Sequence, residues 1–310
     1  MTADTARRAD PSGSEPLSST VAVLLFAVVV MVWGLNWPVT KVIVAGVPPL
    51  WATALRFALA GLVLLVLQLA QGSVIFPRRG DWPIVFGIAG LHMILFTGFM
   101  SIGLQFVPAS RAIVLGYTTP LWVIPGAVLF LGEPLTRWRV LGVSLGIVGL
   151  AVMFNPLAFA WSDQRALLGN ACIMLAALCW AISILQVRGH RWVSTPYQLV
   201  LWEVLLATVV LALLAYLIEG VPDVTWTPPL LVGVAYASVL GTALGYWAMA
   251  MVNRSLPAMT TSLGLLATPV VGTASAAIML GEPITLSLIC AMVLIIGGIA
   301  VGTLVEGKSR

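Results

Sequence analysis

Apolar stretches long enough to cross a lipid bilayer follow one another along almost the whole chain. A helix needs about 20 apolar residues to span a hydrocarbon core about 30 Å thick. Ten stretches meet this length, near residues 21–44, 50–70, 83–104, 107–130, 137–155, 166–187, 197–218, 228–250, 257–280 and 285–305. Only 8% of the 310 residues are charged, against about 25% in soluble domains. A soluble fold is therefore excluded.

The pattern predicts an all-α polytopic membrane protein with ten transmembrane helices. Helices satisfy their own backbone in lipid, and no run alternates polar and apolar residues as the strands of a membrane barrel do. Residues 1–20 mix both signs of charge, so we expect a disordered tail there, followed by a retained first span rather than a cleaved signal peptide. A second short tail, 306–310, ends the sequence.

Basic residues indicate how the spans are oriented. If the N-terminus is cytoplasmic and the spans alternate, eleven of the 15 Lys and Arg residues lie on the cytoplasmic side. Three lie near the external side, and Arg56 lies inside the second span. Cytoplasmic loops carry an excess of Lys and Arg, so both termini are expected to be cytoplasmic. The net charge of +4 thus reflects topology and gives no support to a nucleic-acid partner.

The sequence contains an internal repeat. The segment from Phe130 to Thr136 returns as Met279 to Thr285, 149 residues later, and each copy contains the turn Leu-Gly-Glu-Pro. The two halves, 21–155 and 166–305, hold five spans each. Because five is odd, the second half must enter the membrane from the opposite side. Inverted repeats of this kind are typical of secondary transporters that work by alternating access.

Two five-span halves, each with a Leu-Gly-Glu-Pro turn before its last span, resemble the drug/metabolite transporter superfamily. The segment Trp-Gly-Leu-Asn-Trp-Pro, from Trp33 to Pro38, and Arg56 within the second span resemble the EamA-type exporters. The resemblance covers about residues 20–305. It implies a bacterial inner-membrane exporter of small metabolites, commonly amino acids, with the YddG-type aromatic amino-acid exporters among its relatives. It also implies a central cavity, with the fifth and tenth spans at the periphery.

Polar and aromatic side chains at mid-membrane depth are candidates for the substrate cavity, because a polar group there is costly and needs a function. The candidates are Trp33, Asn36, Trp37, His92, Thr97, Tyr117, Thr119, Trp180, Ser183, Tyr246 and Thr268. Pro38, Pro120 and Pro269 are expected to kink their helices and to free backbone carbonyls. Ordinary packing in the core of the bundle is the competing interpretation for each of them.

Arg56 and Glu203 are the two formal charges well inside predicted spans. Each lies about 10 Å deep, at a rise of 1.5 Å per residue, but from opposite faces of the membrane. A direct ion pair between them therefore requires helix tilt or long side chains. Arg56 is compatible with a structural role, a gate or contact with a substrate carboxylate. Glu203 is compatible with a structural role or with proton coupling.

The scarcity of deep charge also constrains the solute. A phosphate would need several deep cations, and Arg56 is the only one. The first span carries Asn36 rather than the carboxylate that would suit proton-coupled export of cationic drugs. Export of zwitterionic or neutral solutes, namely amino acids (including aromatic ones) and related metabolites, is therefore the main hypothesis. The alternatives are an exporter of neutral drugs or nucleobases, and an integral membrane enzyme acting on lipid, for which no catalytic set is visible.

Neither a cofactor nor a strong oligomer is expected. The three cysteines, Cys172, Cys179 and Cys290, have no metal-ligand spacing, and no Walker motif is present. Glycines at small-xxx-small spacing occur in the predicted fifth and tenth spans. They predict close helix packing inside the bundle, including packing of these two spans on each other. The protein is expected to be a monomer or a weak homodimer in the bilayer.

Overall fold

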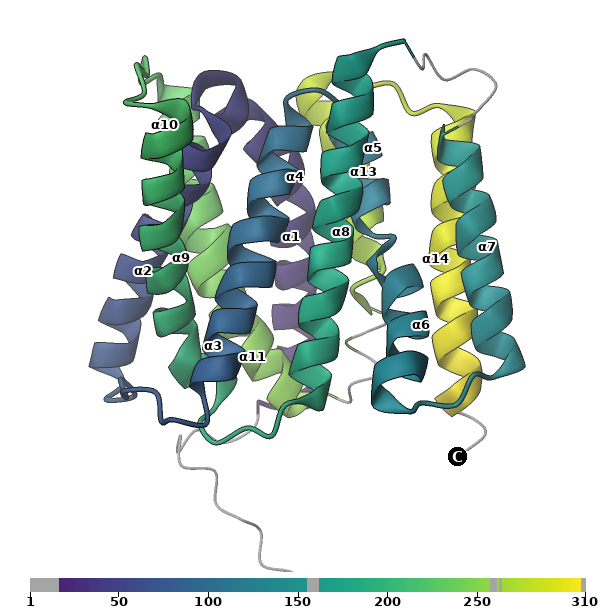
Figure 1. Ribbon diagram of the computed structural model, residues 1–310, viewed down its shortest axis with the longest axis horizontal. Coiled ribbons are helices and arrows are strands. Elements are labelled where there is room, and N and C mark those ends of the chain that lie inside the picture. Colours follow the sequence, from purple (N-terminus) through teal and green to yellow (C-terminus); the bar gives the residue numbers. More distant parts are fainter. Residues whose placement is uncertain (1–16, 155–161, 257–260, 262–263, 308–310) are drawn as a thin grey trace, which may run out of the picture.

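The computed structural model describes residues 17–154, 162–256, 261 and 264–307. Within these ranges every regular element is helical, and the helices run side by side along one direction (Figure 1). The elements are α1 (Ser19–Gly46), α2 (Pro49–Ala70), α3 (Trp82–Gly87), η1 (Ile88–Phe96), α4 (Thr97–Leu104), α5 (Ala109–Gly116), α6 (Thr119–Leu131), α7 (Arg137–Phe154), α8 (Gln164–Gly189), α9 (Pro196–Glu219), α10 (Pro228–Ala235), η2 (Tyr236–Leu244), α11 (Gly245–Ser255), α13 (Ala267–Leu280) and α14 (Leu286–Gly307).

Seven helical stretches are long and apolar enough to cross a membrane, and two shorter apolar helices, Ala267–Leu280 and Leu286–Gly302, accompany them. The prediction of an all-helical polytopic membrane protein is thereby confirmed, whereas the count of ten spans stays a prediction. The first residues of the span expected at 257–280 lie outside the described residues. The boundaries between the expected tails and the helices differ slightly, because α1 begins at Ser19, within 1–20, and α14 runs to Gly307, within 306–310.

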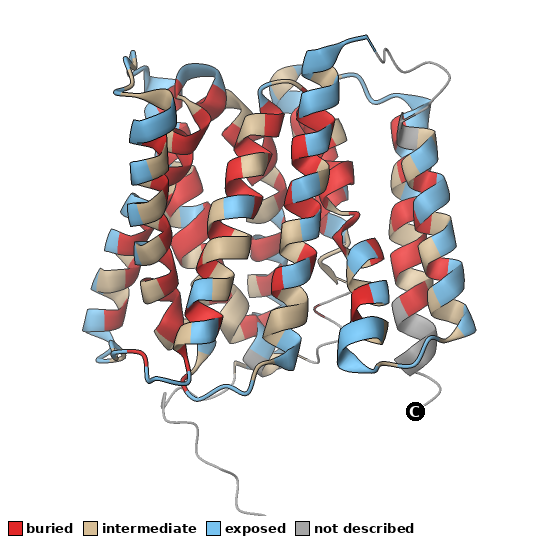
Figure 2. Ribbon diagram, in the orientation of Figure 1, coloured by how far each residue is buried: buried red, intermediate tan, exposed pale blue. Residues whose placement is uncertain are grey.

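Large apolar side chains cover the outside of the bundle. Leu129, Phe130 and Ile278 are 76%, 79% and 85% exposed, respectively. Buried residues lie instead on the faces that the helices turn toward one another (Figure 2). This distribution suits a lipid solvent, since lipid tails are as apolar as these side chains and the driving force for burying them is absent.

Two of the predicted spans contain a π-helical turn. The span expected at 83–104 consists of α3, η1 and α4, and the span expected at 228–250 consists of α10, η2 and α11. Segments η1 and η2 are nine residues long each and begin 148 residues apart, at Ile88 and Tyr236. π-helical turns widen a helix locally and are frequent at functional sites. Both segments contribute residues to the cavity described below.

Proline has different effects in the three helices where kinks were expected. Pro38 lies inside the continuous helix α1. The span expected at 107–130 is interrupted after Gly116, and Pro120 lies in the first turn of α6, where its missing N–H costs no helical hydrogen bond. Pro269 likewise lies in the first turn of α13. The interruption before α6 leaves Tyr117 between two helices.

The two ends of the bundle are tied by different contacts. The end at which α1 begins and α14 finishes is called the terminal end, and the other the opposite end (Figure 1). At the terminal end, Asp81 accepts hydrogen bonds from the Ser194 N–H at 3.0 Å and the Ser194 hydroxyl at 2.7 Å. Burial opposes ionisation of Asp81, but these bonds, a further hydrogen bond from the Arg78 N–H and the electrostatic influence of His190 together lower its pKa. At the opposite end, Glu219 accepts from the N–H groups of Leu50 and Trp51 at 2.9 and 3.1 Å.

Helices α7 and α14 pack on each other at one side of the bundle (Figure 1). A Cβ atom added to Gly142 would lie 2.5 Å from the carbonyl oxygen of Gly298 and 3.2 Å from the Cα of Gly302. The glycines of the two predicted small-xxx-small patterns therefore face each other within one chain. They bring the two backbones into direct contact, as such patterns do in membranes.

Gly142→Ala is expected to lower the free energy of unfolding by about 1–3 kcal/mol, the usual cost of overpacking. The obstacle is the backbone carbonyl of Gly298, which cannot move without displacing α14. Gly297→Ala is the matched control, because a Cβ atom at Gly297 has no neighbour within 4 Å. Thermal unfolding of the purified protein in detergent measures both variants. Equal melting temperatures for the two variants would contradict the close α7–α14 contact.

Candidate functional site

A cavity of about 90 Å³ lies in the centre of the bundle. We call it the central cavity. Its lining comes from α1, α2, η1, α4, α8, η2 and α11, together with the break between α5 and α6. The lining residues are Trp33, Asn36, Trp37, Arg56, His92, Phe96, Thr97, Met100, Tyr117, Trp180, Gly241 and Tyr246. Segments from both sequence halves thus enclose one space.

Aromatic rings form most of the wall, and Trp180 contacts three of them. The rings of His92 and Trp180 are stacked, with centroids 5.9 Å apart and an interplanar angle of 8°. Phe96 lies 5.0 Å from Trp180, and Tyr117 meets it edge-on at 6.1 Å. Tyr246 contacts His92 at 6.2 Å. Aromatic pairs of this geometry contribute about 0.5–1.5 kcal/mol each beyond their buried area, so the wall is a mutually supported unit.

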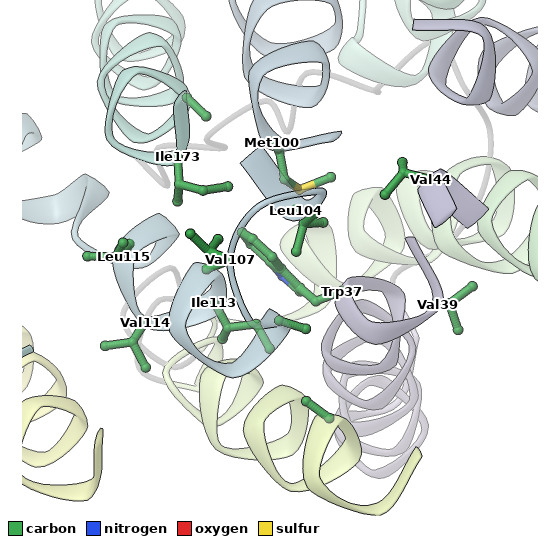
Figure 3. Close-up of a cluster of buried hydrophobic side chains, with 14 of the residues drawn as sticks. Trp37, Val39, Val44, Met100, Leu104, Val107, Ile113, Val114, Leu115 and Ile173 are labelled. Atoms are coloured by element: carbon green, nitrogen blue, oxygen red, sulfur yellow. The ribbon is translucent and has the colours of Figure 1, made fainter. Parts of the chain in front are cut away.

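Two glycines allow one aromatic and one polar residue of α1 to pack closely against neighbouring helices. A Cβ atom at Gly116 would lie 2.5 Å from the ring of Trp37, and one at Gly241 would lie 2.6 Å from Oδ1 of Asn36. Figure 3 shows Trp37 among buried apolar side chains that include Ile113. These close approaches require residues without a side chain. They fix α1 against α5 and η2 and thereby position the polar face of α1 toward the cavity.

The two deep charges are not paired with each other. Nε of Arg56 donates to the hydroxyl of Thr242 at 2.7 Å, and its guanidinium carbon lies 5.8 Å from the centre of the Phe57 ring. Glu203 is only 3% exposed, and its Oε1 has no hydrogen-bond partner among the residues that the structure describes. Among the described residues, no ion pair connects Arg56 and Glu203.

A second cavity adjoins the central one and extends toward the terminal end. This terminal-side cavity has a volume of about 300 Å³ and shares Trp33, His92 and Tyr246 with the central cavity. Its lining also includes Pro196 and Asn253, which lie near the terminal ends of α9 and α11. On the other side of Arg56, a space of only about 10 Å³ remains. The central cavity is therefore connected more widely with the terminal end than with the opposite end.

Eight of the eleven predicted cavity residues line the central cavity, and the remaining three do not line either of the two cavities. The hydroxyl of Thr119 donates to the carbonyl of Gly116 at 2.8 Å, within its own chain segment. Ser183 is buried in α8, and Thr268 is buried next to Tyr117. Arg56 lines the central cavity and Glu203 the terminal-side cavity.

Sequence reasoning missed three lining residues, Phe96, Met100 and Gly241. Phe96 and Met100 are apolar residues in an apolar span, so nothing in the sequence distinguishes them from residues that face lipid. Gly241 carried a weak signal, since a glycine inside a predicted helix often has a packing reason. Here the reason is the approach of Asn36.

Comparisons with known proteins agree with the resemblance stated from the sequence. A model of the EamA-like transporter family matches the chain twice, over residues 20–155 and 167–304. A solved crystal structure superposes with a TM-score of 0.67 and 23% identity, covering 94% of this chain and 99% of its own. At that identity the likeness shows the fold alone.

Several relatives match over nearly their full length. The chain is 28% identical to the uncharacterized transporter YvbV of Bacillus subtilis, covering 95% of this chain and 94% of the relative. It is 30% identical to a probable amino-acid metabolite efflux pump of Salmonella typhimurium, covering 89% and 92%. It is 28% identical to the aromatic amino acid exporter YddG of Ancylobacter novellus, covering 84% and 90%.

These matches set aside the enzyme hypothesis, because the family and its named members are membrane transporters. The two matched segments together cover most of the chain. The chain therefore belongs to the EamA-like transporter family.

Proposed function

We propose that the protein exports amino acids, including aromatic ones, and related neutral or zwitterionic metabolites across the bacterial inner membrane. The observation that carries this proposal is the central cavity, whose wall is aromatic and whose one formally charged lining residue among the described residues is Arg56. Such a wall suits an uncharged or aromatic side chain, while the guanidinium suits a carboxylate. A phosphate ester would find a single cation and no further compensation for its lost hydration.

Alternating access is proposed as the mechanism, with two inverted five-helix repeats, 21–155 and 166–305, and both termini in the cytoplasm. Two sets of facts support it. The family model matches the chain twice, and the π-helical segments η1 and η2 recur 148 residues apart and both line the central cavity. The wider connection of the cavity toward the terminal end then corresponds to a state accessible from the cytoplasm.

Uptake of radiolabelled amino acids into proteoliposomes tests the proposal. A panel of neutral, aromatic, acidic and basic amino acids is measured with and without a pH gradient, beside empty liposomes. We expect transport of at least one neutral or aromatic amino acid. Transport of no amino acid would refute the substrate class and favour the alternative, export of neutral drugs or nucleobases. A rate that is the same with and without the pH gradient would exclude proton coupling through Glu203 or His92.

A further inference from the structure

Glu203, whose Oε1 has no hydrogen-bond partner among the described residues, lines the terminal-side cavity, and this cavity shares Trp33, His92 and Tyr246 with the central cavity that Arg56 lines. We propose that Arg56 and Glu203 together recognise a zwitterion, with Arg56 binding the carboxylate of the solute and Glu203 its ammonium group. This inference deepens the proposed function and rests on it, because it assigns one side chain to each charged end of an amino acid.

The two terminal NH₂ groups of Arg56 can donate hydrogen bonds to a carboxylate. Its Nε is used by Thr242 at 2.7 Å, which fixes the orientation of the guanidinium plane. No hydrogen bond or ion pair engages its two terminal NH₂ groups in the part of the chain that the structure describes. Because Arg56 lines the central cavity, a solute in that cavity can reach its side chain. A guanidinium with two free amino groups matches the two oxygens of a carboxylate.

Glu203 presents the complementary acceptor. It belongs to α9, it is 3% exposed, and its Oε1 has no hydrogen-bond partner within the described parts of the chain. It lines the terminal-side cavity together with Trp33 and Tyr246, whose rings attract cations. A buried carboxylate without a partner is strongly disfavoured, and a bound cation relieves this cost. The ammonium group of a solute is a cation that can reach it from the cavity.

The two charges border adjoining spaces. The central and the terminal-side cavities share Trp33, His92 and Tyr246. Tyr246 lies within electrostatic range of both Arg56 and Glu203. The two side chains are not joined by an ion pair, so a solute headgroup can enter between them rather than compete with an existing bridge.

Charge balance favours a zwitterion over either monovalent ion. A zwitterion compensates both Arg56 and an ionised Glu203, whereas a cation leaves Arg56 unpaired and an anion leaves Glu203 without an ammonium partner, either unpaired or protonated. Losing one partner of a buried, hydrogen-bonded charge pair weakens binding by at least about tenfold. The site should therefore discriminate against amino-acid analogues that lack one of the two groups.

The test compares one amino acid with its two truncated analogues. The amino acid is the one that the proteoliposome panel transports best; for phenylalanine, the analogues are 3-phenylpropionate and 2-phenylethylamine. Inhibition of uptake gives the affinity of each compound for the parent, Glu203→Gln and Arg56→Gln. In the parent, we expect the amino acid to bind at least about tenfold more tightly than either analogue. In Glu203→Gln, the preference for the amino acid over 3-phenylpropionate, which lacks the ammonium group, should disappear. In Arg56→Gln, the preference for the amino acid over 2-phenylethylamine, which lacks the carboxylate, should disappear.

Glu219→Gln is the matched control, since Glu219 is a second acidic residue of α9 whose carboxylate binds backbone N–H groups of α2. Both preferences should survive in that variant. If Glu203→Gln does not fold, Glu203→Asp is measured instead. It retains the charge and should retain the preference for the amino acid over 3-phenylpropionate. Equal weakening of all three compounds in Glu203→Gln would overturn the inference while leaving amino-acid export intact. If the parent transports no amino acid, the proposed function fails and the inference fails with it.

Discussion

Trp180→Ala is expected to lower transport at sub-saturating substrate concentration by at least about tenfold, which corresponds to about 1.4 kcal/mol. Trp180 supports the aromatic wall through ring contacts with His92, Phe96 and Tyr117. Removing it abolishes those three contacts and leaves a hole beside the binding space. Initial uptake rates into proteoliposomes, normalised to the amount of folded protein, measure the effect.

Two further variants separate the loss of the cavity wall from a general loss of stability. Trp180→Phe keeps an aromatic ring at the position and should retain most of the transport. Trp226→Ala removes a tryptophan that is 47% exposed and lies before α10, outside the cavity, so its transport should match the parent. A folded Trp180→Ala protein that transports at the parental rate would refute the assignment of the central cavity as the substrate site.

The class of fold was predictable because a bilayer imposes one simple requirement, a long apolar stretch for each span. Interruptions inside the spans were not predictable. Segments η1 and η2 are apolar, as transmembrane segments generally are, so hydropathy does not mark them as π-helical. The break after Gly116 depends on how α5 and α6 meet the neighbouring helices. The sequence repeat does not reveal the hydrogen-bond register, which changes from i+4 in the α-helices to i+5 in the π-helical segments η1 and η2.

The cavity was predictable to the extent that polar and aromatic residues at mid-depth need a reason to be there. That rule found Trp33, His92 and Trp180, which line the central cavity. It failed for Ser183 because depth alone does not determine which way a helix faces. It also failed for Met100, an apolar residue that sequence cannot distinguish from a lipid-facing one.

Sequence symmetry also did not predict how the two Leu-Gly-Glu-Pro turns differ. Glu133 forms ion pairs with Arg139 at 2.8 Å and Arg188 at 2.6 Å. Glu282 instead accepts hydrogen bonds from the N–H groups of Ala109 and Ser110 at 2.7 and 2.8 Å. Identical turns therefore bind different partners at the two ends of the bundle. Under the proposed alternating access, a single conformation is expected to be asymmetric in this way, because the two ends are not open together.

The connection 105–108 at the opposite end is held from both sides. Lys41 donates to the carbonyl of Leu104 at 3.0 Å and to that of Val107 at 2.5 Å, just before α5. Glu282 binds the first N–H groups of α5 and also accepts from the Ser110 hydroxyl at 2.6 Å. A carboxylate at a helix N-terminus satisfies free donors and complements the helix dipole. This contact attaches the α13–α14 turn to α5.

Glu282→Gln is therefore expected to open the opposite end of the bundle. Hydrogen bonds to a charged group contribute about 1.5–3 kcal/mol, and the amide retains one acceptor oxygen but no charge. Ser101 lines the small space on the closed side of Arg56 and serves as the reporter position. In a background in which Cys172, Cys179 and Cys290 are serine, Ser101→Cys should react with a membrane-impermeant thiol reagent, added at the opposite end, at least about tenfold faster when Glu282 is glutamine.

Glu133→Gln is the matched control, since Glu133 occupies the same turn of the first half but binds arginines at the terminal end. It breaks no contact at the opposite end, so the reactivity of the cysteine at position 101 toward the reagent should not rise. One outcome is that the cysteine at position 101 is modified faster in Glu282→Gln alone, and more slowly by reagent added at the terminal end. That result would mean that the contact of Glu282 with α5 stabilises the state that is open toward the terminal end. Unchanged reactivity in Glu282→Gln would contradict this, because the closure of the opposite end would then depend on packing rather than on the carboxylate.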